Sequence, residues 1–168
     1  VKLSQIAVFY RTNACSRVLE DSMRRFRLPY VLLGGMKFYE RAEVKDALAW
    51  CRLLVNPDDS EAFLRAVSSP RRCIGDTTLD AVQVHAGRVQ RSVPAAARDL
   101  VQRGEAGRAK DKLDAFFKLV ESMRDGLDHL RANQVGERVL EGSGLRKALK
   151  DEASHQSQDR LENLQQLL

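Results

Sequence analysis

Residues 38–57 read FYERAEVKDALAWCRLLVNP, and the spacing of apolar and charged residues in this stretch predicts an amphipathic helix. The side chains that form its apolar side are Val44, Leu48, Trp50, Leu53 and Leu54. Pro57 is expected to end the helix, because proline lacks a backbone N–H and disfavours helical geometry in the residue before it.

Upstream of this helix, two short apolar runs flank another helical pattern. Residues 6–10 (IAVFY) and 30–35 (YVLLGG) contain β-branched and aromatic residues and predict two strands. Between them, apolar residues recur at helical spacing over residues 16–26. The order strand, helix, strand predicts a βαβ unit, so we expect the chain to begin as an α/β structure.

Downstream, every segment with a periodic pattern is helical. Asp59 or Ser60 can cap a helix that follows Pro57. The segment 109–132 has apolar residues on one face, but Gly126 interrupts it at a cost of roughly 1 kcal/mol relative to alanine. We expect a break there. The predicted fold class is therefore an α/β start followed by an all-helical array, predominantly α.

Charge, motifs and the spacing of cysteines and histidines restrict the classes of function that the sequence supports. The net charge of +5 comes from basic residues in the first two-thirds of the chain, which suits a polyanionic partner such as nucleic acid. No G-x-x-x-x-G-K-[ST] or G-x-G-x-x-G motif is present, so the sequence predicts no complete triphosphate site. Three widely spaced cysteines and three scattered histidines predict no metal site.

The ends of the sequence suggest a piece of a longer protein. The chain starts at Val1, just before a predicted strand, and ends on an uncapped apolar stripe within residues 160–168 (RLENLQQLL). No stretch reaches the 18 apolar residues of a membrane span, so we expect no membrane association.

Tyr10 and Arg11 follow the first predicted strand directly. At the carboxyl end of a strand in an α/β sheet, side chains project toward a ligand crevice. Tyr10 offers a flat face for a base, and the Arg11 guanidinium suits phosphate oxygens. The residues alone also allow a packed tyrosine beside a solvated arginine at an ordinary strand end.

Longer stretches around these residues decide between the two readings. Residues 8–17 (VFYRTNACSR), 38–52 (FYERAEVKDALAWCR), 69–80 (SPRRCIGDTTLD) and 160–168 occur in the order of family motifs. Together they closely resemble the UvrD/Rep family of superfamily 1 DNA helicases, and the resemblance spans essentially the whole chain. It implies that residues 1–56 are part of the second RecA-like motor domain (2A) and residues 57–168 part of the helical 2B domain.

The resemblance also implies a function for the parent protein. It would be an ATP-dependent 3′→5′ DNA helicase and translocase of bacterial DNA repair, cytoplasmic and associated with the nucleoid. Its partners would be single-stranded and duplex DNA, ATP with Mg²⁺, and the remainder of its own helicase chain. The nucleotide would bind only with the first motor domain, so the isolated chain is expected to be inactive. The alternatives are a non-enzymatic helical DNA-binding module and a protein-docking domain.

Roles for individual residues follow from the same resemblance. Tyr10 matches the tyrosine that stacks on adenine, and Arg11 matches the catalytic arginine that reaches the γ-phosphate. Phe38, Tyr39 and Arg41 could order the nucleotide cleft or contact the DNA track. Alternatively, Arg41 could face solvent at a helix start together with Lys45.

The stretch 69–80 resembles a turn that grips the backbone of duplex DNA. The implied DNA-binding residues of this turn are Arg71, Arg72, Gly75 and Thr77. Cys73 stands where the family usually has glycine, so a positive φ at this position would be strained. A purely structural turn is the alternative.

Overall fold

The structure is a computed structural model that describes residues 2–11, 15–33 and 37–168. Gly34 and Gly35, which were expected to stop the second strand, lie outside the described residues. Within those residues, no helix is both long and apolar enough to cross a membrane.

The described elements are helical throughout. The α-helices are α1 (Ser16–Arg25), α2 (Ala42–Val55), α3 (Ser60–Ser68), α4 (Asp76–Val89), α5 (Val93–Arg103), α6 (Lys110–Arg124), α7 (Ala132–Gly142), α8 (Leu145–Glu152) and α9 (His155–Leu167). Short 3₁₀ helices are η1 (Leu3–Gln5), η3 (Phe38–Glu40), η4 (Gly107–Ala109) and η5 (Leu127–His129).

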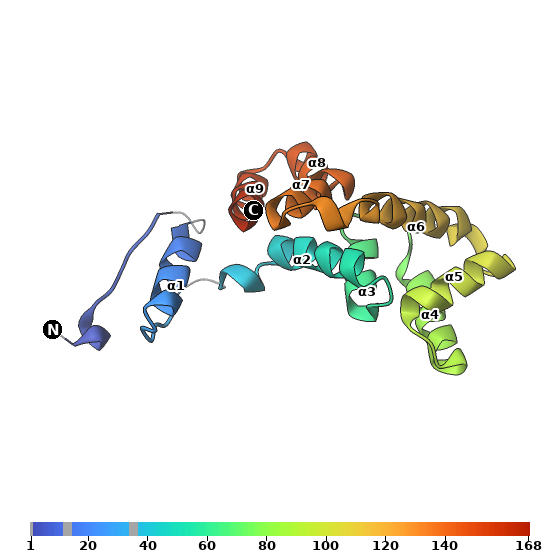
Figure 1. The fold of residues 1–168 in the computed structure, drawn as a ribbon, viewed down its shortest axis with the longest axis horizontal. Coiled ribbons are helices and arrows are strands. Elements are labelled where there is room, and N and C mark those ends of the chain that lie inside the picture. Colours follow the sequence, from blue (N-terminus) through green and yellow to red (C-terminus); the bar gives the residue numbers. More distant parts are fainter. Residues whose placement is uncertain (1, 12–14, 34–36) are drawn as a thin grey trace.

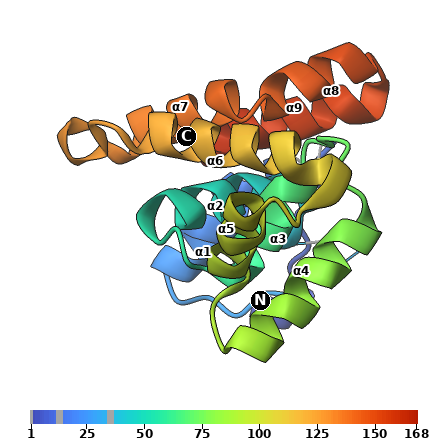
Figure 2. The ribbon, with the colours of Figure 1, turned by 90° about the vertical axis from the view of Figure 1, so that its right-hand side faces the viewer.

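The molecule is elongated, with α1 and the N-terminal segment at one end and the α4–α5 pair at the other (Figure 1). Helix α2 packs against α3, α6, α7 and α9 and so occupies the centre of the array. Seen from the end, α6 to α9 lie over α2, α3 and α5 (Figure 2).

Aromatic side chains fill the middle of this core. Trp50 and Phe63 are fully buried, and the ring centroid of Phe116 lies 5.3 Å from that of Trp50 and 5.6 Å from that of Phe63. The ring of Phe117 stacks on Phe63 at 5.7 Å. The indole N–H of Trp50 donates to the carbonyl of Ser69 at 2.9 Å, so the one polar atom of the tryptophan is satisfied.

The helix predictions around this core are confirmed. Four of the five predicted apolar side chains of α2 are buried, and Leu48 is half-buried. Asp59 caps α3, its carboxylate accepting from the backbone N–H of Ala62 at 2.9 Å. Helix α6 ends at Arg124, and Gly126 follows with φ of 67°, so the predicted break lies where expected.

The predicted α/β start is wrong. Residues 2–11, 15–33 and 37–168 contain no strand, and the expected βαβ unit is replaced by extended segments beside α1. Ile6 has extended backbone angles, but Phe9 and Val31 are 94% and 82% exposed. A strand needs a neighbouring chain to complete its hydrogen-bond ladder, and no described segment supplies one. The residue types in the two runs favour an extended backbone, but they do not specify the neighbouring strand that a sheet needs.

Candidate functional site

The first candidate site is the Tyr10–Arg11 pair, which lies in the extended segment before α1. Tyr10 is half-buried, and Arg11 is exposed. No hydrogen bond or ion pair joins Arg11 to another described residue, so its guanidinium is available to an external anion. These two groups suit the base and the phosphates of a nucleotide.

The same segment has no ligands for a divalent cation. Mg²⁺ prefers carboxylate and other oxygen ligands, which neither Tyr10 nor Arg11 provides as a set. Across the described residues, no group of three or more His, Cys, Asp or Glu side chains could hold a metal ion. Tyr10 and Arg11 are thus of residue types that suit the base and phosphates of a nucleotide, while the described residues supply no ligand cluster for its Mg²⁺.

Arg41 lies inside the molecule, where three elements meet. Its side chain donates from Nη1 to Asn163 Oδ1 at 2.5 Å and from Nη2 to Ser16 Oγ at 2.7 Å. Its guanidinium carbon also lies 5.4 Å from the ring centroid of Phe38. The expectation that Arg41 faces solvent beside Lys45 is wrong, because only 7% of Arg41 is exposed. A DNA phosphate could reach this group only if those contacts opened.

The second candidate site is the turn between α3 and α4, where the structure separates two adjacent arginines. Arg71 is exposed and has no hydrogen-bond partner among the described residues. Arg72 is half-buried and donates to the carbonyls of Pro70 and Ser143, at 2.9 and 2.7 Å. Its guanidinium carbon lies 4.9 Å from the centroid of Trp50, and burial lowers the pKa of Arg72. Arg72 therefore fixes the turn to the array, while Arg71 faces outward.

The turn reaches α4 through a strained residue. Cys73 has φ of 56°, in the left-handed region that favours glycine. Its carbonyl accepts from Lys112 Nζ at 2.8 Å. Gly75 is the N-cap of α4 with φ of −77°, and an added Cβ would meet only open space. The exposed Thr77 lies in the first turn of α4.

This arrangement brings two cations to the beginning of a helix. The exposed Lys112, in the first turn of α6, donates to the carbonyl of Cys73 in the turn that also carries the exposed Arg71 and leads into α4. A helix N-terminus favours phosphate, although Asp76 in the same turn opposes it. Lys112 could not be predicted from the sequence, because only the tertiary fold brings it to Cys73.

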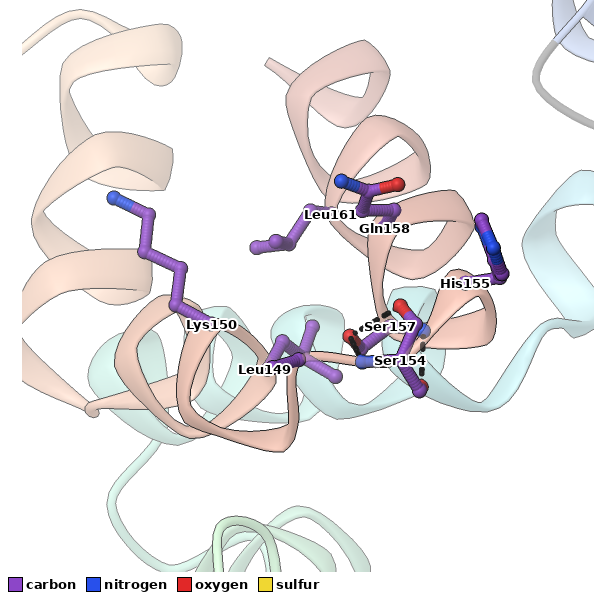
Figure 3. A pocket seen from close by; sticks show the side chains of 8 residues that line it. Leu149, Lys150, Ser154, His155, Ser157, Gln158 and Leu161 are labelled. Carbon is purple, nitrogen blue, oxygen red and sulfur yellow. Dashed lines mark hydrogen bonds between the residues drawn. The ribbon is translucent and has the colours of Figure 1, made fainter.

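A cavity of about 380 Å³ lies between α8 and α9 (Figure 3). Its lining residues are Leu149, Lys150, Ala153, Ser154, His155, Ser157, Gln158 and Leu161. Ser154 and Ser157 bond each other as the capping box of α9, which satisfies the hydroxyls that face it. No cluster of charges converges on this cavity, and we assign it no ligand.

The described elements form a helical array with an exposed turn that carries Arg71. The family model described as UvrD-like helicase C-terminal domain matches residues 1–168. DNA helicase II of Escherichia coli (strain K12) is 40% identical over 167 residues, which are 99% of this chain and 23% of that protein. ATP-dependent DNA helicase PcrA of Bacillus subtilis (strain 168) is 39% identical, with the same coverage.

The chain therefore belongs to the UvrD-like helicase C-terminal domain family. DNA helicase II of Haemophilus influenzae is similar in the same way, at 37% identity over 168 residues. The chain spans 23% of the length of each of these relatives.

Proposed function

We propose that this chain is part of an ATP-dependent 3′→5′ DNA helicase and translocase of bacterial DNA repair. The observation that carries the proposal is the family match over all 168 residues, which includes both candidate sites. Its relatives are named DNA helicase II and ATP-dependent DNA helicase. Residues 1–56 would belong to the second motor domain (2A) and residues 57–168 to the helical 2B domain.

Tyr10 and Arg11 would form one side of the ATP site. Tyr10 would stack on the adenine, and Arg11 would stabilise charge that develops on the transferring γ-phosphoryl group. Such a site is completed by a phosphate-binding loop and Mg²⁺ ligands on another part of the protein. ATP with Mg²⁺ and the remainder of the helicase chain are therefore proposed partners. The exposure of Arg11 and its lack of a described partner support this role.

The α3–α4 turn would contact duplex DNA close to its junction with single-stranded DNA. Arg71, Gly75 and Thr77 lie at the surface, and Lys112 extends the cationic surface beside them. Arg72 would support this surface from beneath. Phosphate contacts of this kind position a protein on DNA without reading its sequence. Such a protein would work in the cytoplasm, at the nucleoid.

A non-enzymatic helical DNA-binding module is the second candidate, since the array and its basic turn could bind DNA without a nucleotide. DNA-stimulated ATP hydrolysis by the full-length protein separates the two. Arg11→Ala should lower kcat by about two orders of magnitude or more, because it removes charge stabilisation in the transition state.

Arg25→Ala is the matched control, because Arg25 is exposed at the end of α1 and has no partner among the described residues. We expect it to leave kcat unchanged. A wild-type protein that binds DNA but never hydrolyses ATP would support the binding module. Equal kcat in the Arg11→Ala variant and the wild type would remove Arg11 from the proposed site.

A further inference from the structure

Helix α1 is attached to the rest of the molecule by polar contacts. It lies at one end, apart from the packed array (Figure 1). Its only buried residues are Ser16 and Glu20, one helical turn apart on one face, while the apolar Val18 is 66% exposed. Hydrogen bonds depend on direction, whereas apolar contacts do not. The orientation of α1 is therefore set by the partners of these two residues.

The partner of Ser16 is Arg41, which is held from two sides. The Asn163 carboxamide of α9 accepts from Arg41 at 2.5 Å and donates to Glu43 Oε1 of α2 at 2.6 Å. Asn163 and Glu43 are 4% and 9% exposed. Buried polar groups of this kind are costly to leave unpaired, so the chain of bonds has one favoured arrangement.

The second attachment runs through η3 and involves the same guanidinium. Glu20 accepts from the backbone N–H of Phe38 at 3.3 Å, and the Phe38 ring contacts both Arg41 and Arg17. Arg41 therefore takes part in both attachments of α1. It donates to Ser16 directly, and it contacts Phe38, whose backbone N–H donates to Glu20.

We propose that Arg41 is a positioning residue for the nucleotide site. Through Ser16 it fixes the first turn of α1, and Tyr10 and Arg11 lie only a few residues before that turn. The buried Arg41–Asn163–Glu43 chain would thereby tie the placement of Arg11 to α2 and α9 of the array. This inference rests on the proposed role of Arg11 at the phosphates. Misplacing a reacting group by about 1 Å can cost about 10²-fold in rate.

The test uses the full-length protein and DNA-stimulated ATP hydrolysis. Ser16→Ala removes one hydroxyl and leaves the other bonds of Arg41 in place. Arg41→Lys removes the fork that reaches Ser16 and Asn163 together. We expect each variant to lower kcat by about tenfold, since a displaced Arg11 loses part of its effect on the transition state.

Arg138→Lys is the matched control, because Arg138 donates to the carbonyls of Met123 and Asp125 at 3.3 and 2.5 Å, within the array. It should lower the thermal midpoint without changing kcat. A double-mutant cycle excludes a merely structural effect. If Ser16 acts through Arg11, then Ser16→Ala should lower kcat no further in the Arg11→Ala background.

The outcomes distinguish the positioning role of Arg41 from the proposed nucleotide site at Tyr10 and Arg11. A wild-type kcat in Ser16→Ala, with Arg11→Ala still inactive, overturns the positioning role and leaves the proposed function intact. Additive losses in the double variant also overturn it. A wild-type kcat in Arg11→Ala overturns the proposed site itself. If Arg41→Lys fails to fold, the Ser16→Ala cycle alone decides.

Discussion

Arg71 and Arg72 are neighbours in the chain, but their guanidinium groups have different surroundings. The Arg71 side chain is exposed, whereas that of Arg72 lies against Trp50 and donates to two carbonyl groups. A solvent-exposed cation that contacts a DNA phosphate releases counterions from the DNA. The half-buried Arg72 is instead bound by the carbonyls of Pro70 and Ser143, so it supports the turn. The motif implied one role for both residues, and burial distinguishes them.

Arg71→Ala should therefore weaken duplex binding without unfolding the protein. One lost phosphate contact lowers the salt slope of log K by about 1. Arg72→Ala should instead lower the free energy of unfolding by about 2 kcal/mol, because it removes charged hydrogen bonds to two carbonyls. Fluorescence anisotropy of labelled duplex across salt concentrations, with thermal unfolding, measures both effects.

Arg88→Ala is the control for that titration. Arg88 is exposed near the other end of α4, roughly 18 Å from the turn at 1.5 Å per helical residue. We expect its salt slope to match the wild type. A slope that Arg71→Ala leaves unchanged would show that the turn is only structural.

Cys73 gives a second prediction at this scale. Its φ of 56° is unfavourable for a residue with a Cβ, so Cys73→Gly should raise the free energy of unfolding by about 1 kcal/mol. Duplex affinity should stay the same or increase slightly. Cys15→Gly is the matched change at a φ of −66°, where glycine adds freedom to the unfolded chain and should destabilise. Calorimetry of both variants checks the opposite signs.

At the scale of elements, α4 and α5 form a pair that is joined by a side-chain hydrogen bond as well as by packing. His85 Nε2 of α4 lies 2.8 Å from Asp99 Oδ2 of α5, and Arg103 donates to Asp99 Oδ1 at 3.0 Å. The hydrogen bond with His85, followed by that of Arg103, lowers the pKa of Asp99. The ionised carboxylate is thus favoured in the folded state.

This lowered pKa predicts an acid-sensitive contribution to stability. A carboxyl whose pKa is lower in the folded state stabilises the fold above its unfolded pKa, about 3.9 for Asp. That contribution is lost as pH falls through the folded pKa. The wild type should therefore have a higher thermal midpoint than Asp99→Asn at pH 6, and the difference should shrink below about pH 4.

Asp80→Asn is the control, since Asp80 is exposed on α4 and has no ion pair with another described residue. Its difference from the wild type should stay nearly constant over the same pH range. A difference for Asp99→Asn that is equally constant would mean that the ionised Asp99 carboxylate does not stabilise the α4–α5 pair.

The elements also show what periodicity can predict. The apolar stripes of α2 and α6 could be predicted because the backbone hydrogen bonds of a helix form within one segment. The spacing of apolar residues in that segment therefore indicates which face is buried. Gly126 and Asp59 act locally and were predicted for the same reason. The runs 6–10 and 30–33 failed as strands because a strand depends on a neighbour that its own sequence does not specify.

At the scale of the whole molecule, contacts between distant residues make the candidate sites. Arg41 and Asn163 are 122 positions apart, and Lys112 and Cys73 are 39 apart. No local pattern could predict either contact, so the sequence left the role of Arg41 open between the cleft, the DNA track and solvent, and it gave no sign of Lys112. Tyr10 and Arg11 could be proposed from the sequence because both come from one short motif.

The isolated 168-residue chain should fold, bind duplex DNA and fail to hydrolyse ATP. Its core runs through helices from α2 to α9, which favours independent folding of the array. The described residues offer Tyr10 and Arg11 to a nucleotide but no metal-ligand cluster, and the sequence has no phosphate-binding loop. A steady-state ATPase assay with single-stranded DNA measures this, with the full-length protein as the positive control. Duplex binding that Arg71→Ala weakens would show that the purified chain is folded in the same assay buffer. DNA-stimulated turnover by the isolated chain would contradict the proposal that it holds only one side of the ATP site.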